Sequence, residues 1–148
     1  MVDKGLIGVT GEYFVAAELS NRGYIASITL RNTKGIDILA SNVDTSRYVG
    51  VQVKTTTVNK KEWTLGKKAE NYFEKELFYI FVKLKADNVK PDYHIVPSKT
   101  VAEYVKKDYD KWFNTLGKNG QEHNPTTMRK FRDLNDKYLE KWELLELG

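Results

Sequence analysis

The sequence predicts a single α/β domain in which helices flank a central mixed β-sheet. Its length of 148 residues is that of one domain and is enough to bury a core without disulfides. The N-terminal segment carries apolar side chains at helical spacing, and several later segments show the two-residue alternation of strands. No internal repeat or low-complexity segment divides the chain, so residues 1–148 are expected to form one domain.

The first helix is predicted to run from near residue 4 to Asn21. Val15, Ala16 and Leu19 form an apolar stripe at the spacing of one helix face. Gly23 follows as a typical residue at a helix C-terminus. The apolar stripe needs a partner surface, so this helix is expected to pack against the sheet.

Strands are predicted at 24–30, 36–40, 48–55, 77–84 and 92–98, because these segments are rich in β-branched and aromatic residues or alternate in polarity. Residues 31–35 are expected to form a loop. A short polar stretch joins 36–40 to 48–55, and strands joined over so short a connection pair antiparallel.

Three further helices are expected in the second half of the chain. A short one is predicted near 67–75, after a basic turn, and a longer one at 100–116 with Ser98 or Thr100 as its N-terminal cap. A final amphipathic helix is predicted from a stripe of apolar residues at helical spacing. That stripe consists of Phe131, Leu134, Tyr138, Trp142 and Leu145.

The composition argues against several classes of protein. The chain has no cysteine, which excludes a disulfide framework and a cysteine zinc site and is natural in the cytosol. No apolar run resembles a signal peptide or reaches membrane-spanning length, so a cytoplasmic protein without membrane contact is expected. The formal net charge of +4 permits nucleic acid as a partner without requiring it.

Polar side chains lie opposite the apolar ones on two of these strands. Ile36 and Ile38 share one face, which leaves Asp37 on the other. In 48–55 the valines at 51 and 53 share the apolar side, which leaves Gln52 and Lys54 opposite. If the hairpin register sets Asp37 near Gln52, three polar groups from two strands converge on one point.

Glu12 lies on the helical stripe of Val15 and Leu19 and is therefore expected to face the sheet. A buried carboxylate is costly unless a cation or a hydrogen-bond donor meets it. Lys54 supplies one cation, and a divalent metal ion would supply another. Ligation by carboxylate, amide and carbonyl oxygens suits magnesium or manganese rather than zinc.

Three short motifs resemble those of the PD-(D/E)XK nuclease superfamily, whose fold occurs in restriction enzymes, Holliday-junction resolvases and repair nucleases. They are "GE" at 11–12, "GID" at 35–37 and "QVK" at 52–54. The resemblance covers roughly residues 5 to 57 and implies a restriction-endonuclease-like αβββαβ core. The chain departs from the family pattern in having isoleucine at 36 for proline and Gln52 where glutamate is usual.

The resemblance implies a metal-dependent DNA endonuclease that hydrolyses phosphodiester bonds. Glu12, Asp37, Gln52 and the carbonyl of Val53 would hold Mg²⁺ or Mn²⁺. Lys54 would orient or deprotonate the attacking water, or stabilise the transition state. Superfamily nucleases often act as dimers, so the resemblance also implies a homodimer.

Two alternatives remain open from the sequence. The first is a nucleic-acid-binding or protein-interaction module on the same fold, whose catalytic site has decayed at Gln52. The second is an α/β domain in which the polar cluster is an ordinary buried ion pair. Each residue also has a structural explanation of its own: Glu12 could complement a helix dipole, Asp37 could cap a turn, and Gln52 and Lys54 could be solvated.

Contacts with the DNA backbone are predicted just beyond these motifs. Thr55 and Thr56 could donate to phosphates or complete the strand, and Lys60 and Lys61 could follow the backbone or form a solvated face. Trp63, beside them, is more typical of a core residue.

A second, weaker basic patch is formed by Arg129, Lys130 and Arg132, which are expected at the start of the last helix. His94 and His123 lie far apart in the sequence without the spacing of metal ligands. Structural roles are therefore expected for both histidines.

Overall fold

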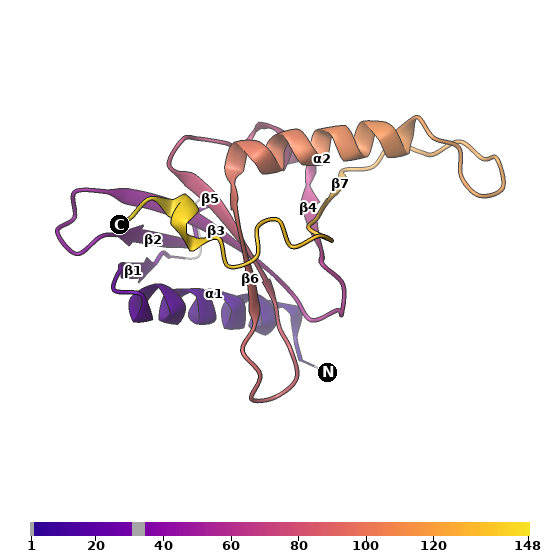
Figure 1. The fold of residues 1–148 in the computed structure, drawn as a ribbon. Helices are drawn as coiled ribbons and strands as arrows, with labels where there is room; N and C mark the ends of the chain where they lie inside the picture. The colour runs from indigo at the N-terminus through magenta and orange to yellow at the C-terminus, as the bar shows by residue number, and fades with distance from the viewer. Residues whose placement is uncertain (1, 31–34) are drawn as a thin grey trace.

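The computed structural model describes residues 2–30 and 35–148 (Figure 1). Gly35 is therefore the one described residue of the loop expected at 31–35. The elements, in chain order, are α1 (Lys4–Asn21), β1 (Ile25–Ile28), β2 (Ile38–Ser41), β3 (Tyr48–Thr56), β4 (Glu62–Gly66), the 3₁₀ helix η1 (Lys67–Asn71), β5 (Leu77–Lys83), β6 (Asp92–Pro97), α2 (Ser98–Phe113), β7 (Met128–Arg132) and the 3₁₀ helix η2 (Trp142–Leu145).

The expected mixed sheet is confirmed. Within the described residues its strands lie in the order β1-β2-β3-β5-β6. β2 pairs antiparallel with β1 and with β3, as the short connection predicts, and β3 pairs parallel with β5. β4 and β7 pair antiparallel in a separate ribbon. The crossover between the parallel strands is formed by β4 and η1, where the sequence predicts only a short helix.

Helices cover both faces of the sheet (Figure 1). On one face, Val15 and Leu19 of α1 pack with Val51 and Val53 of β3 in a buried cluster. On the other face, α2 and the β4–β7 ribbon cover a second cluster, which includes Trp63, Tyr79, Phe81, Val105 and Phe131. The alternation of β3 therefore directs its valines toward α1 and its even-numbered side chains toward the ribbon.

α1 approaches β3 most closely at Gly11. A Cβ atom built on Gly11 would overlap with Thr55 Oγ1 and lie 2.9 Å from Thr55 Cβ, whereas a Cβ on Gly8 would meet nothing within 4 Å. The absence of a side chain at Gly11 thus allows the helix to lie against the end of β3.

The substitution Gly11→Ala is expected to destabilise the protein by about 1–3 kcal/mol, because the added methyl group overpacks a helix–strand contact. Gly8→Ala is the matched control on the same helix, and it should stabilise by up to about 1 kcal/mol through helix propensity. Urea unfolding of both variants measures the two values. Equal effects of the two substitutions would contradict the close packing at Gly11.

Several secondary-structure predictions for the second half of the chain are wrong. β4 is a strand where a basic turn was expected, and its Trp63 and Leu65 are buried while Thr64 is exposed. α2 begins at Ser98 with no side-chain cap at its N-terminus. The Ser98 hydroxyl instead bonds the backbone of Glu74, donating to the carbonyl and accepting from the N–H. The expected cap at Ser98 or Thr100 is therefore wrong.

The predicted final amphipathic helix is also wrong, because its stripe divides between two clusters. Phe131 lies in β7 and packs in the cluster under α2, whereas Trp142 and Leu145 lie in η2 and pack in the cluster on the α1 face. The carboxylate of Asp133 accepts from the backbone N–H groups of Lys137 and Tyr138. Short acidic side chains that bond the backbone in this way compete with helix formation.

The two histidines lie in different surroundings. His94 is buried, and its Nδ1 lies 2.7 Å from Oδ2 of Asp133. The ring of His123 stacks on that of Trp112. Among the described residues, no helix is long and apolar enough to cross a membrane.

Candidate active site

The candidate site lies where β2 stops and β3 continues. The ladder between the two strands ends at the pair Ile38–Val51, while β3 runs on to Thr56 beside β5. The N–H of Asp37 donates to the carbonyl of Val51 at 2.8 Å. The N–H of Val53 then donates to Oδ2 of Asp37 at 2.7 Å, so that a carboxylate replaces the next backbone partner. We call this place, formed by Asp37, Gln52, Val53 and Lys54, the notch.

The register brings the polar residues of the two strands to one level. Continued by one residue from Ile38–Val51, it sets Asp37 opposite Gln52. On the other side of β3, Gln52 pairs with Tyr79 and Lys54 pairs with Phe81, which are buried in the cluster beneath the ribbon. Gln52 and Lys54 therefore share the face opposite α1.

Asp37 is held in an environment that disfavours its charge. Burial raises the pKa of Asp37 above its ordinary value of 3.8, and the hydrogen bond from Val53 and the charge of Lys54 offset only part of this rise. A half-buried carboxylate beside one lysine favours a further cation. The notch is thus electrostatically suited to a metal ion.

The raised pKa of Asp37 predicts a gain in stability on removing its charge. The folded state binds the Asp37 proton more tightly than the unfolded state, so the contribution of Asp37 to stability falls as pH rises through its folded pKa. Asp37→Asn is therefore expected to raise the free energy of unfolding at pH 7, and the difference should shrink in acid below pH 4.

Asp44 provides a control of opposite sign for this experiment. Hydrogen bonds from Ser46 lower the pKa of Asp44, so its contribution to stability is present at neutral pH and is lost in acid. Asp44→Asn should therefore lower stability at pH 7. Urea unfolding at both pH values measures the effects, and an Asp37→Asn variant less stable than wild type at pH 7 would contradict the burial of this charge.

The turn before Asp37 is fixed by Tyr72. The Tyr72 hydroxyl donates to the carbonyl of Gly35, and the backbone of Gly35 has φ of 66°, a conformation that favours glycine. A Cβ on Gly35 would also overlap with the Tyr72 ring. Burial, followed by the negative charge of Asp37, raises the pKa of Tyr72. No sequence pattern links Tyr72 to Asp37, so this support was missed.

Glu12 is half-buried on α1, next to the contact between Gly11 and Thr55. α1 covers the face of the sheet opposite Gln52 and Lys54, so a contact between Glu12 and the notch would have to pass the end of the β2 ladder. The structure places Asp37, Gln52 and Lys54 together directly. A shared site with Glu12 stays a prediction.

A groove with a volume of about 490 Å³ leads away from the notch, between the start of α1, the end of β3 and β4. Lys54 belongs to both the notch and the groove. Lys4 and Lys60 line the groove as well, and so do the threonines at 55, 56 and 57. The lysines and the hydroxyl groups of Thr56 and Thr57 are groups that can contact a phosphodiester backbone. Lys4 was missed because only the packing of α1 brings it to β3.

The other predicted DNA contacts have different surroundings. Lys61 points elsewhere, and its ammonium lies 2.7 Å from Oδ2 of Asp136. Thr55 Oγ1 is buried against Gly11 and has no hydrogen-bond partner within the described residues. Thr56 Oγ1 accepts from the backbone N–H of Val58 at 3.2 Å.

The potential metal ligands at the notch fit a hard divalent ion. They are oxygen atoms of the Asp37 carboxylate, the Gln52 amide and the Val53 carbonyl, which points to the same side of β3 as the N–H bonded to Asp37. No group of three or more His, Cys, Asp or Glu side chains gathers anywhere in the described part of the chain. The site therefore carries less negative charge than a site built from three carboxylates.

Comparison with known proteins supports the fold. No protein-family model matches the chain, and no curated protein sequence matches it significantly. The solved structure of a bacterial homing endonuclease, I-Ssp6803I, is 12% identical with a TM-score of 0.58, and the match covers 100% of this chain and 95% of that chain. Hjc, a Holliday junction resolvase from Archaeoglobus fulgidus, is 14% identical with a TM-score of 0.48, covering 85% of this chain and 84% of that chain. The chain thus shares the overall fold of the homing endonuclease structure.

Proposed function

We propose that the protein is a metal-dependent DNA endonuclease of the PD-(D/E)XK type. The observation that carries the proposal is the notch itself, where Val53 N–H fixes the carboxylate of Asp37 beside Lys54. The adjoining groove, with Lys4 and Lys60, suits the DNA backbone. The fold shared with a homing endonuclease supports this assignment.

Each residue of the notch has a distinct role in the proposed reaction. Asp37, with one oxygen held by Val53 N–H, would hold the metal ion with its other oxygen, together with the Gln52 amide and the Val53 carbonyl. Glu12 would complete the ligands from the α1 side. Lys54 orients the attacking water and stabilises the negative charge that develops on the phosphate.

A bound Mg²⁺ or Mn²⁺ would supply positive charge that stabilises the phosphoryl oxygens and makes water a stronger acid. The side chains of the groove and the notch determine which phosphate of the DNA reacts. The groove holds the DNA strand so that the scissile phosphate lies next to Lys54, which lines both places. Tyr72 keeps the Gly35 turn, and hence Asp37, in position.

The test is cleavage of single-stranded, duplex and branched DNA by the purified protein with Mg²⁺, Mn²⁺, Ca²⁺ or EDTA. Cleavage with Mg²⁺ or Mn²⁺ is expected, and Ca²⁺ should bind without supporting turnover. Asp37→Ala should abolish both cleavage and calorimetric metal binding. Equal metal binding by wild type and Asp37→Ala would place the metal elsewhere and contradict the proposal.

A second candidate function rests on Gln52. A neutral amide in place of a carboxylate weakens the attraction for a divalent ion, which favours a DNA-binding module without catalysis. Such a module would bind the same DNAs through the groove and would cleave none of them with any metal. If the protein binds none of these DNAs, both functions are contradicted. The polar cluster would then be an ordinary buried ion pair in an α/β domain.

A further inference from the structure

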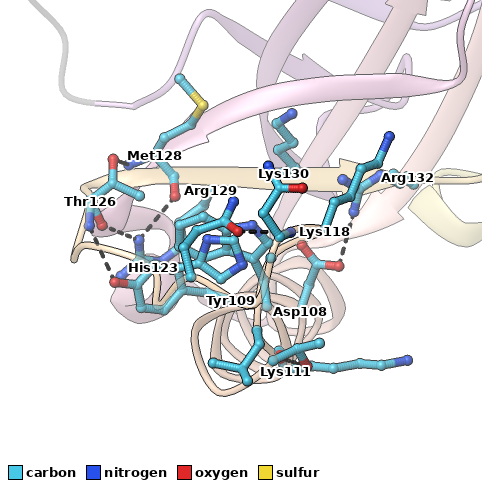
Figure 2. Close-up of a pocket in the computed structure, with 16 residues that line it drawn as sticks. Asp108, Tyr109, Lys111, Lys118, His123, Thr126, Met128, Arg129, Lys130 and Arg132 are labelled. Carbon is cyan, nitrogen blue, oxygen red and sulfur yellow. Dashed lines mark hydrogen bonds and ion pairs between the residues drawn. The ribbon is translucent and has the colours of Figure 1, made fainter.

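A second cavity is lined by residues of the second half of the chain, where a segment projects from the sheet. Figure 1 shows the C-terminal end of α2 and the segment that follows it extending beyond the sheet before the chain returns in β7. A cavity of about 840 Å³ lies between these segments (Figure 2). We call residues 109–127 the arm, and this cavity the arm cleft. Its volume is in the range of ligand-binding clefts.

The wall of the arm cleft at the start of β7 is held by Arg129. Its guanidinium is buried over the Tyr109 ring, 3.5 Å from the centroid, and its Nε lies 2.5 Å from Oε2 of Glu70. The same side chain donates to the carbonyls of Thr126 and Met128. These contacts tie the arm to β7 and η1, so the cleft is preformed.

The arm cleft carries an excess of positive charge. Its lining includes Asp108 as an acidic residue, against the basic residues Lys111, Lys118, Arg129, Lys130 and Arg132. Arg132 is paired with Asp108 at 2.9 Å and with Glu62 at 3.0 Å. Lys111 and Lys118 form no ion pair with any described residue. These two ammonium groups are available to an anionic ligand.

A flat aromatic surface lies in the same cleft. The rings of Trp112 and His123 are stacked with centroids 4.0 Å apart and planes 23° apart. Trp112 is 41% exposed, whereas Trp63 and Trp142 are 2% and 4% exposed. An exposed aromatic stack in the same cleft as uncompensated lysines is a combination by which proteins bind the bases and phosphates of unpaired nucleic-acid strands.

The β4–β7 ribbon contributes residues both to the arm cleft and to the groove that leads from the notch. Thr64 and Glu62 of β4 line the groove, and Lys130 and Arg132 of β7 line the cleft. Thr64 pairs with Lys130 and Glu62 pairs with Arg132, so residues that line the two cavities are neighbours on one face of the ribbon. Side chains paired across two strands are neighbours, so the ribbon links the lining of the groove to that of the cleft.

We infer that the arm cleft binds an unpaired nucleotide of the DNA strand that runs on from the groove, with its base against Trp112 and His123 and its phosphates at Lys111 and Lys118. The inference rests on the proposed function for the identity of the polymer. It adds a contact that distinguishes DNA with an unpaired segment near the cleavage site from a continuous duplex. A protein segment without acidic residues would use the same aromatic surface but would gain nothing from the two lysines.

The test uses single-stranded oligothymidylate in EDTA, so that no cleavage occurs. Stacking on the base is expected to quench tryptophan fluorescence in wild type and in the control Trp142→Phe, and not in Trp112→Phe. By anisotropy, Trp112→Ala and the double variant Lys111→Ala/Lys118→Ala should each bind about tenfold more weakly, as expected for the loss of one stacked base. Lys99→Ala, an exposed lysine at the other end of α2, should bind as wild type does.

Quenching that persists in Trp112→Phe, or wild-type affinity in Trp112→Ala, would overturn the inference. Trp112→Phe retains an aromatic ring and serves as the conservative variant if Trp112→Ala does not fold. A change of sedimentation in Trp112→Ala with unchanged DNA affinity would assign the cleft to contact with a second copy of the chain and would also overturn it. Failure of the nuclease proposal is distinguishable, because it would appear as absent cleavage while oligothymidylate binding remains.

Discussion

The substitution Lys54→Ala is expected to slow DNA cleavage by about 10²- to 10⁴-fold, the range typical for loss of a positioned proton-transfer or charge-stabilising group. Lys54 lies beside Asp37 and also lines the groove. Its ammonium is therefore expected to contact the scissile phosphate rather than the rest of the DNA backbone. DNA affinity in EDTA should change little, because one lysine is a small part of a charged footprint. Single-turnover cleavage and anisotropy measure the two quantities separately.

Lys60→Ala is the matched control in the same groove. It should likewise change DNA affinity little, and it should leave the single-turnover rate at saturating protein close to that of wild type. Cleavage that persists in Lys54→Ala at the wild-type rate would indicate a contaminating nuclease or a site elsewhere. It would contradict the assignment of the notch.

The substitution Gln52→Glu is expected to tighten Mn²⁺ binding by about tenfold, because a hard cation prefers a charged oxygen ligand to an amide. Without metal, the new carboxylate lies opposite Asp37, so like-charge repulsion should lower stability at neutral pH. Calorimetry with Mn²⁺ and urea unfolding in EDTA measure these effects. The double variant Asp37→Ala/Gln52→Glu is the control and should show no such gain in affinity.

Gln52→Glu also separates the two candidate functions. If wild type cleaves DNA, the variant should retain or increase that activity. If wild type binds DNA without cleaving it, cleavage gained by Gln52→Glu alone would show that the catalytic site decayed at this position. A variant with unchanged Mn²⁺ affinity would mean that residue 52 is not a ligand, under either function.

Local patterns were sufficient to predict the part of the fold that holds the notch. The alternation of Val51 and Val53 with Gln52 and Lys54 determines which face each side chain takes, and the short connection from β2 determines the antiparallel pairing. Asp37 therefore comes opposite Gln52 as soon as the hairpin forms. The position of Glu12 depends instead on how α1 crosses the sheet, which periodicity alone does not give.

Long-range contacts account for what the sequence did not reveal. Trp63 of β4 and Phe131 of β7 belong to strands that pair across a long stretch of chain, and neither short segment carries a strong strand signal alone. Apolar residues after β7 fell by chance at helical spacing, although Asp133 binds the backbone of the following turn. The support of Gly35 by Tyr72 and the arm cleft itself likewise exist only in the folded chain.

The most direct test of the notch as a metal-dependent catalytic site is the anomalous difference density of Mn²⁺ in crystals of wild type and of Asp37→Asn. A peak bonded to the Asp37 carboxylate and the Val53 carbonyl is expected in wild type, and it should be missing in Asp37→Asn. A Mn²⁺ ion bound elsewhere, with the notch empty, in crystals of a protein that cleaves DNA with Mn²⁺ would contradict the account.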